Sequence, residues 1–428
     1  MNLSIGIDLG TSACRVAVLD QSGQLLHLSR SNLPEPIIDD LHCEQSPEDW
    51  WQACRLALTE ALSQVDKSAV TRIAVDGTSS TLLLCDKHGH ATSPALMYRD
   101  QRAQKQAEFI ATFAPAISAT RSASSSLAKL LWFKGQGLLK DGLIALHQAD
   151  WISGRLRGHF DSTDENNALK LGYDAINRCW PEWLSNCQLP PHCLPTVVPA
   201  CQCLGSIDPQ MAKQFGLPDH CQVIAGTTDS TATFMASGAK RLGEALTVLG
   251  STLVIKILSD KPIFAPEMGI YSHRIGENWL VGGASNSGGA VLKQFFSTEQ
   301  IETLSPLIDP AKPSSLNYMP LPGRGERFPV NNPDLLPCFE PRPTSDVDFL
   351  QAILESIARI EQQGYEALAQ LGAPKPVSIR SSGGGAHNQT WEAIRQRMLD
   401  APLLKSDHDE AAVGVAMLAL STQTTNEQ

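Results

Sequence analysis

The chain lacks any apolar run long enough to cross a membrane, which would need roughly 18 consecutive apolar residues. It also lacks a block of Lys or Arg, and its formal net charge is -11. The first absence predicts that no helix spans a membrane, and the second argues against nucleic acid or an anionic membrane as the main partner. No basic segment precedes an apolar core at the N-terminus, so we expect no signal peptide and a cytoplasmic protein.

Two common nucleotide-binding signatures are missing as well. There is no G-x-x-x-x-G-K-[ST] motif, and no G-x-G-x-x-G motif joins a strand to a helix. The eleven cysteines are scattered, and the irregular spacing of Cys187, Cys193, Cys201 and Cys203 favours packed, reduced thiols over a zinc site. With 428 residues, of which 42% are hydrophobic and 18% charged, the chain can form two or three globular domains.

What the chain does contain is one kind of turn twice. Residues 5–12 (IGIDLGTS) and 247–252 (TVLGST) each read as an apolar strand that runs into a turn of Gly, Ser and Thr. Such a turn offers backbone N–H groups to a phosphate chain. Asp8 precedes the first turn only, where it could hold Mg²⁺ through water. Either turn alone is more often an ordinary hairpin, but the two together, with Asp8 in the first only, favour a phosphate-binding pair.

The apolar spacing predicts an α/β layer architecture with two similar halves. In the first half we expect strands at 3–9, 14–19, 24–30, 70–76 and 82–85, and helices at 47–65 (N-cap Ser46), 99–110 and 122–135. In the second half we expect strands at 222–225, 248–253, 254–258, 268–273, 279–281 and 377–382, a loop at 304–345, and helices at 232–238, 346–371, 391–399 and 410–420. Two such domains would close on a nucleotide across a central cleft.

Three polar segments are candidates for the chemistry. Asp229 follows an apolar strand and precedes a helix, so it is either a helix N-cap or a general base facing a cleft. Residues 383–388 (GGGAHN) allow either a close ligand approach or a plain strand–helix turn. Residues 76–80 (DGTSS), with Asp150 and residues 161–167, suit a polyol pocket or simple turn chemistry.

In this order, these motifs resemble the FGGY family of carbohydrate kinases. The resemblance rests on residues 7–12 (IDLGTS), 76–79 (DGTS), 147–151 (HQADW), 163–170 (TDENNALK), 226–229 (GTTD), 249–252 (LGST) and 383–388 (GGGAHN). It implies the two-domain actin/sugar-kinase/Hsp70 ATPase fold, which is ribonuclease H-like with a central cleft. The N-terminal sugar-binding lobe would be 1–236, completed by the helix in 410–428, and the nucleotide-binding lobe 237–409.

The resemblance also implies the roles of single residues. Asp229 would be the catalytic base, and Asp8 would support the reaction centre and Mg²⁺. ATP would bind through Gly10, Thr11, Ser12, Gly250, Ser251, Thr252, Gly288, Gly384, Gly385 and Asn388. The sugar would lie against Asp8, Thr78, Ser79, Asp150, Asp164 and Asp229.

The implied reaction is ATP-dependent phosphorylation of a ketopentose at a terminal hydroxyl. The DGTSS segment is most similar to the compact, xylulose kinase-like branch of D-ribulose kinases, so D-ribulose is the expected substrate, with D-xylulose or a pentitol as the alternative. From another class, an actin/Hsp70-like ATPase without sugar transfer stays open. A small-molecule sugar is the only expected partner, and the protein is expected to be a monomer or a homodimer.

Overall fold

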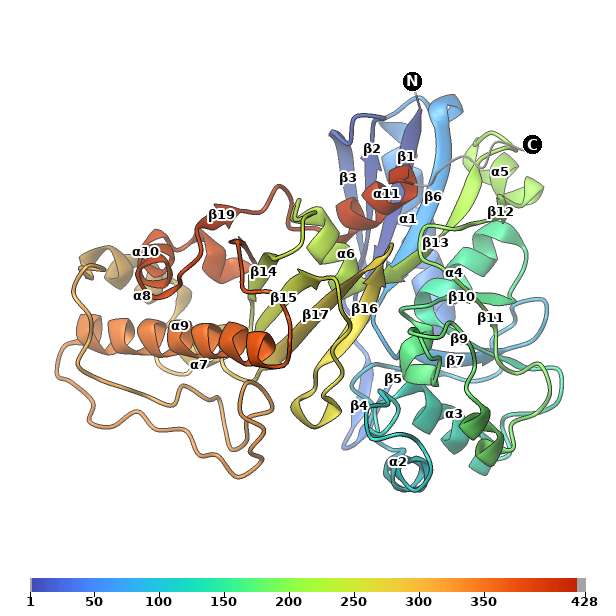
Figure 1. Ribbon diagram of the computed structural model, residues 1–428. Coiled ribbons are helices and arrows are strands. Elements are labelled where there is room, and N and C mark those ends of the chain that lie inside the picture. The colour runs from blue at the N-terminus through green and yellow to red at the C-terminus, as the bar shows by residue number, and fades with distance from the viewer. Residues whose placement is uncertain (1, 422–428) are drawn as a thin grey trace. The chain divides into compact units, whose positions relative to one another are not determined.

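The computed structural model describes residues 2–421 and divides the chain into two compact units (Figure 1). Unit 1 consists of Met1–Ala236 with Glu410–Gln428, and unit 2 of Ser237–Asp409. Each unit is a mixed sheet flanked by helices, so the expected two-domain α/β fold class is confirmed. No helix within residues 2–421 has the length and apolar character of a membrane span.

The main sheet of unit 1 has six strands and begins with the first predicted hairpin. Its order is β12 (Cys203–Ser206), β13 (Gln222–Thr228), β6 (Val70–Gly77), β1 (Leu3–Leu9), β2 (Ala13–Leu19) and β3 (Leu25–Asn32). β1 is antiparallel to β2 and parallel to β6, and β6 is parallel to β13. The three parallel strands therefore end at one edge of the sheet, where polar side chains can meet.

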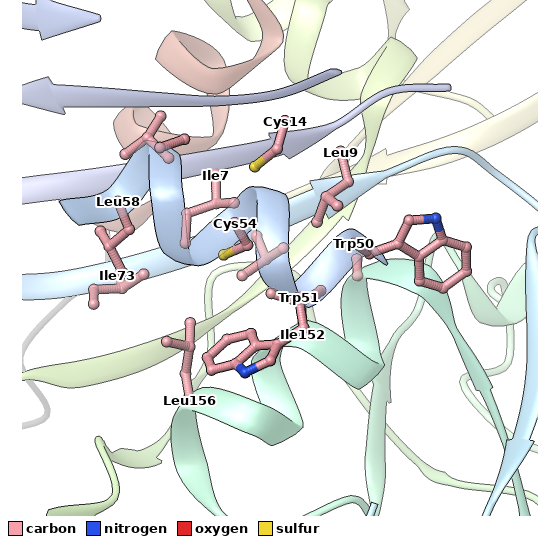
Figure 2. Packing of buried hydrophobic residues seen from close by; sticks show 14 of the residues in the cluster. Ile7, Leu9, Cys14, Trp50, Trp51, Cys54, Leu58, Ile73, Ile152 and Leu156 are labelled. Atoms are coloured by element: carbon pink, nitrogen blue, oxygen red, sulfur yellow. The ribbon is translucent and has the colours of Figure 1, made fainter. Parts of the chain in front are cut away.

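Helices bury both faces of this sheet. On one face, Ile7 and Leu9 of β1 pack with α1 (Pro47–Ser63) and α4 (Gln148–Arg157), whose Trp50 and Ile152 belong to the same apolar cluster (Figure 2). On the other face lie α11 (Ala411–Ser421) and α6 (Asp229–Ala236). β1 and β2 are buried on both faces and are therefore mostly apolar along their length, whereas the edge strand β3 alternates between half-buried and exposed residues.

The remaining elements of unit 1 form a smaller antiparallel layer. Its sheet has the order β4 (Ile37–Asp39), β5 (His42–Gln45), β8 (Ala95–Leu96), β7 (Leu82–Cys85) and β9 (Ile144–His147). Alongside are α2 (Gln104–Ala111), α3 (Ser126–Gly135) and the strand pair β10 (Ser162–Asp164) and β11 (Thr196–Val198). α5 (Pro209–Phe215) lies instead beside β12, and its Ala212 and Phe215 belong to the apolar cluster of the main sheet (Figure 1). Short 3₁₀ helices occupy Lys67–Ala69, Ala168–Leu171 and Glu182–Cys187.

Unit 2 repeats the strand order of unit 1. Its sheet runs β16 (Tyr271–Ile275), β17 (Asn278–Ser285), β15 (Leu253–Ser259), β14 (Glu244–Leu249), β18 (Ser378–Ser382) and β19 (Leu403–Lys405), with β14 parallel to β18. The helices are α7 (Gly289–Leu292), α8 (Thr298–Leu304), α9 (Asp346–Gln370) and α10 (Gln389–Met398), with 3₁₀ turns at Pro266–Met268, Ser305–Leu307 and Gly384–His387. β14, β15, β17, β18 and β19 thus correspond to β1, β2, β3, β6 and β13.

Some local predictions were wrong at element boundaries. Residues 250–252 form the turn between β14 and β15, so the predicted strand 248–253 ends early, at Leu249. The helix predicted from residue 99 begins at Gln104, because residues 97–100 form a turn around the buried carboxylate of Asp100. Ser46 stands at the N-cap of α1, but its side chain makes no capping hydrogen bond.

Three glycines bring elements of unit 1 closer than any side chain would permit. A Cβ atom on Gly414 of α11 would lie 1.8 Å from the carbonyl oxygen of Ala232 in α6. Cβ atoms on Gly6 and Gly226 would lie 2.0 and 1.7 Å from the backbone oxygens of Ala412 and Val75. At Gly6 and Gly414 the backbone of α11 therefore lies directly against the backbone of β1 and α6.

We expect Gly414→Ala to destabilise the protein, although alanine in a helix interior normally gains about 1 kcal/mol over glycine. Overpacking against Ala232 should lower the free energy of unfolding by about 2 kcal/mol or more. Urea unfolding measures the difference. Gly323→Ala is the control, since a Cβ there meets nothing within 4 Å. A Gly414→Ala protein as stable as the wild type would contradict this packing.

Candidate active site

Three carboxylates come together at the edge where the parallel strands of unit 1 end. In the pairing of β1 with β6, Asp8 stands directly opposite Asp76, and in that of β6 with β13, Asp76 stands opposite Thr227. Opposed residues of paired strands project to the same side of the sheet. Asp229, the first residue of α6, lies two residues beyond Thr227 and is close enough for its charge to act on Asp76.

Asp76 is the most unusual of the three. Its side chain is fully buried, and among residues 2–421 only the carboxyl of Asp8 is close enough to share a proton with it, so no N–H or O–H of another residue satisfies its oxygens. Burial, followed by the negative charges of Asp8 and Asp229, holds the pKa of Asp76 well above its ordinary value. The sequence analysis included Asp76 in the candidate segment 76–80 but assigned roles only to Thr78 and Ser79. The sequence feature that points to Asp76 is a single acidic residue at the end of an apolar strand.

Arg15 of β2 supplies the local positive charge, and the sequence prediction missed it. Its Nη1 lies 3.2 Å from Oδ2 of Asp8, and its Nε lies 3.1 Å from Oε2 of Glu410, next to the start of α11. Burial raises the pKa of Asp8, and the charge of Arg15 opposes this rise only in part. The site is therefore acidic overall, with one cation beside it.

The turn after Asp8 presents its amide groups outward. The carbonyl oxygens of Thr11 and Ser12 accept hydrogen bonds from Gln45 Nε2 (2.8 Å) and from the Leu33 N–H (2.8 Å). Within the part of the chain that the structure describes, the N–H groups of Thr11 and Ser12 have no acceptor. A turn with occupied carbonyls and free amides is an anion-binding nest.

A chain of hydrogen bonds shapes the polar segment 78–81. The Tyr98 N–H donates to Thr81 Oγ1 (3.0 Å), the hydroxyls of Thr81 and Thr78 lie 2.6 Å apart, and Thr78 Oγ1 donates to Gln148 Oε1 (2.9 Å). Thr78 is thus buried and engaged. Ser79, by contrast, is half-buried, and its hydroxyl has no partner in residues 2–421.

Asp150 and Asp164 have local structural roles. Asp150 Oδ2 accepts hydrogen bonds from the backbone N–H and from Nδ1 of His147, completing the capping box of α4. Asp164 accepts from the N–H groups of Asn166 and Asn167 and from Asn167 Nδ2. Burial, together with the charge of Asp150, raises the pKa of Asp164 to about 7. Both carboxylates are nearly buried, so turn and cap chemistry accounts for them.

In unit 2 the turn at Gly250–Thr252 has the same electrostatic character as the first turn. The carbonyl oxygens of Gly250 and Ser251 accept the N–H groups of Gly289 and Ala290 at 2.8 and 3.0 Å, while the N–H groups of Ser251 and Thr252 have no acceptor among the described residues. Gly288 allows these hydrogen bonds to form, because a Cβ atom at residue 288 would lie 2.8 Å from the carbonyl oxygen of Ser251.

The glycine run after β18 divides into packing and open positions. Cβ atoms on Gly383 and Gly385 would approach Leu249 and Trp391 to within 2.9 and 2.5 Å, whereas Gly384 is exposed and a Cβ there would meet nothing within 4 Å. Asn388 caps α10: its Oδ1 accepts the Trp391 N–H (3.0 Å) and its Nδ2 donates to Ser305 Oγ (2.8 Å). Of this group, Gly384 alone is free of packing constraints.

The carboxylates of Asp8 and Asp76 fit a divalent cation that is bound through water. Within residues 2–421 no three His, Cys, Asp or Glu side chains are arranged to hold a metal by themselves. The oxygens of Asp76 and the adjacent Asp8 nevertheless provide hard oxygen donors of the kind that Mg²⁺ prefers, with water and phosphate oxygens completing its shell.

Comparison with known families gives matches over nearly the whole chain. The N-terminal domain of the FGGY family of carbohydrate kinases matches residues 3–236, and its C-terminal domain matches residues 245–422. The "Xylulose kinase" of Escherichia coli (strain K12) is 26% identical over 438 residues, covering 97% of this chain and 89% of the relative. The "Gluconokinase" of Bacillus subtilis (strain 168) is 21% identical, covering 97% and 86%.

Solved structures show the same fold. A xylulose kinase from Lactobacillus acidophilus superposes with a TM-score of 0.88 at 18% identity, covering 100% of this chain and 91% of the other. A "xyloylose kinase" from Brucella ovis gives a TM-score of 0.87 at 22% identity, covering 98% and 90%.

We expect Asp76→Asn to make the protein more stable than the wild type near neutral pH. A carboxyl whose folded pKa is raised contributes stability that is fully present below its unfolded pKa, at about pH 4, and is lost as the pH rises through the folded pKa. The isosteric amide does not ionise, so the variant should gain about 1–3 kcal/mol over the wild type by pH 7.

Chemical unfolding of both proteins from pH 4 to pH 8 checks this sign. Asp39→Asn, at an exposed position on β4, is the matched control and should leave the pH dependence unchanged. A difference between Asp76→Asn and the wild type that stays flat or narrows with rising pH would contradict the assignment.

Proposed function

Because this chain belongs to the FGGY family of carbohydrate kinases, we propose that it transfers the γ-phosphoryl group of ATP to a terminal hydroxyl of a ketopentose. The observation that carries this proposal is the group of Asp8, Asp76 and Asp229 beside an anion-binding turn in unit 1. Phosphoryl transfer requires a base for the acceptor hydroxyl and neutralisation of the phosphate charge. Asp229 supplies the first, while Arg15 and the free amides contribute to the second.

For the acceptor we place D-xylulose first and D-ribulose second. The xylulose kinases among the relatives favour D-xylulose, although the DGTSS segment first suggested D-ribulose. A sugar acid such as gluconate is disfavoured in spite of the gluconokinase relatives. Three carboxylates and one nearby cation would repel its negative charge.

In the proposed mechanism the sugar lies against Asp8, Ser79 and Asp229. As the sugar oxygen attacks the γ-phosphorus, its O–H bond breaks and the proton passes to a carboxylate oxygen of Asp229. The new O–P bond forms while the bond from the γ-phosphorus to the bridging oxygen breaks, and ADP leaves with that electron pair. Asp229 is held for this by its own helix, since its Oδ1 accepts the Ser230 N–H at 2.6 Å.

Unit 1 is proposed as the sugar-binding lobe and unit 2 as the nucleotide-binding lobe. Asp8 and Asp76 would hold Mg²⁺ through water, and the metal would supply charge neutralisation at the phosphates. In unit 2 the adenosine would approach the exposed backbone at Gly384, and the amides of Ser251 and Thr252 would bind phosphate oxygens. Asn388 would act through the α10 cap, because its side chain is already engaged.

We expect Asp229→Ala to lower kcat for the sugar by about 100- to 10,000-fold, since general-base catalysis contributes that much. The Kd for ATP, measured by calorimetry, should change little. Asp39→Ala, which removes an exposed carboxylate from the same unit, is the control. Sugar turnover retained by Asp229→Ala would contradict its assignment as the base.

The acceptor is determined by kcat/KM for D-xylulose, D-ribulose, a pentitol and gluconate, with ADP release followed in a coupled assay. We expect D-xylulose to give the highest value. A higher value for D-ribulose would keep the mechanism and reverse the order of the two ketopentoses. ADP release that no sugar stimulates would contradict the proposed function and favour an ATPase without sugar transfer.

A further inference from the structure

Lys129 of α3 is fully buried, and it has no acidic partner. Its Nζ donates to the carbonyl oxygens of Ser80 (2.8 Å) and Met97 (2.7 Å), and it forms no ion pair within residues 2–421. Burying a charged amine that forms no ion pair costs several kcal/mol, which the more distant charge of Asp100 offsets only in part, whereas a methionine of similar length has no such cost. The two carbonyl contacts are therefore what the lysine adds.

Both contacts hold the segment that carries Ser79. Ser80 has a φ of 69°, a left-handed conformation that costs a non-glycine residue roughly 1–2 kcal/mol. Its hydroxyl is buried without a partner, so its side chain does not fix this conformation. The Thr81 N–H closes the turn on the Thr78 carbonyl oxygen at 3.3 Å, and Lys129 adds a hydrogen bond to the Ser80 carbonyl from outside the segment. Met97 begins the turn that ends at Asp100, and the next residue, Tyr98, donates its N–H to Thr81 Oγ1. The amine of Lys129 therefore links residues 78–81 to the neighbouring segment 97–100.

We propose that Lys129 is a positioning residue that sets the conformation of residues 78–81 and thereby the affinity for the acceptor sugar. This inference rests on the proposed function, which places Ser79 against the sugar. Lys129 itself touches no reacting atom. It acts through the backbone of Ser80, whose neighbour Ser79 has the unpartnered hydroxyl.

The neutral form of the Lys129 amine matches the two carbonyl acceptors around it, those of Ser80 and Met97. Burial lowers its pKa to about 7, and the negative charge of Asp100 opposes this. Lys170 and Arg102 lower the pKa further, and Cys43 is the remaining titratable group that acts on it. The neutral amine has two N–H donors for two carbonyls, whereas the ammonium has a third without a protein acceptor among the described residues. Although an ammonium donates stronger hydrogen bonds than an amine, burial disfavours its charge, so protonation below about pH 7 favours conformations in which Nζ reaches water. The pair of hydrogen bonds from Lys129 to Ser80 and Met97, here called the Lys129 clamp, should therefore weaken as the pH falls below about 7.

The test compares Lys129→Met with Lys134→Met. Lys134 lies on the same helix and also donates to two carbonyl oxygens, those of Cys187 (2.8 Å) and Gln188 (2.7 Å), in a different segment. We expect Lys129→Met to raise the KM for the preferred ketopentose by about 10- to 100-fold, as a misplaced contact does. The KM for ATP should stay within about twofold of the wild type. Lys134→Met should leave both constants unchanged.

A second readout separates positioning from general loss of structure. The wild-type sugar KM should rise between pH 8 and pH 6, and the part of this rise due to Lys129 should be absent in Lys129→Met. Equal effects of Lys129→Met on both KM values, or a sugar KM that does not change, would overturn the proposal. Should Lys129→Met not fold, a wild-type sugar KM that is flat from pH 8 to pH 6 would overturn it.

Failure of this inference is distinguishable from failure of the proposed function. Hydrogen–deuterium exchange of residues 78–81 needs no substrate, and it should be faster in Lys129→Met than in the wild type or in Lys134→Met. Unchanged exchange would overturn the role of Lys129 even if the protein phosphorylates a sugar. A wild type that phosphorylates none of the sugars, with faster exchange in Lys129→Met, would overturn the link to sugar affinity and the proposed function while leaving the Lys129 clamp intact.

Discussion

The parallel pairing of β1 with β6 is the constraint on which the chemistry of unit 1 depends. Its register sets Asp8 directly opposite Asp76 on a face otherwise closed by α11. A shift of β1 by one residue would turn Asp8 into the apolar layer beneath α1 and bring Ile7 and Leu9 to the face that carries Asp76. The large apolar cluster on that side therefore fixes the geometry of the acidic site as well as the stability of the sheet.

The energetically unfavourable features of this site are concentrated in one region. A buried carboxyl at Asp76 opposite that of Asp8, a left-handed Ser80, a buried amine at Lys129 and the unpaired Nε2 of Gln148 all lie on or against the segment that leaves β6. Each feature would be less costly as an apolar or glycine residue. Strained and unsatisfied groups of this kind gather at functional sites, where surrounding structure holds them in place.

The two units show how one topology carries two roles. The same strand order and the same Gly-Ser/Thr turn occur in both, and in each the turn's carbonyls are occupied while its amides stay free. The difference lies in the strand before the turn: Asp8 in β1 has Val248 as its counterpart in β14. Unit 2 thus keeps the anion-binding turn without the carboxylate, which accords with binding rather than catalysis.

The sequence by itself determined the main elements and the family. Periodicity predicted the longer strands of both main sheets and the long helices α1 and α9, since that signal is local, and the duplicated turn predicted the repeated topology. The short strands β4, β5, β8 and β9 of the smaller sheet and the helix α4 were not predicted, because they are too short or too polar to show a clear period. The motifs also indicated the FGGY family, which the matches over both domains confirmed. The helix at 99–110 was placed too early, because the buried Asp100 holds a turn that no local pattern reveals.

Only the tertiary structure decided which polar residues have protein partners. It assigned Asp150, Asp164 and Asn388 to caps and turns, left Ser79 and the turn amides free, and brought Asp76 and Lys129 into the account. It also separated the packing glycines from Gly384. The physical reason is the same throughout. Burial and hydrogen-bond partnership depend on which strands pair and in what register, and these contacts join residues far apart in the chain.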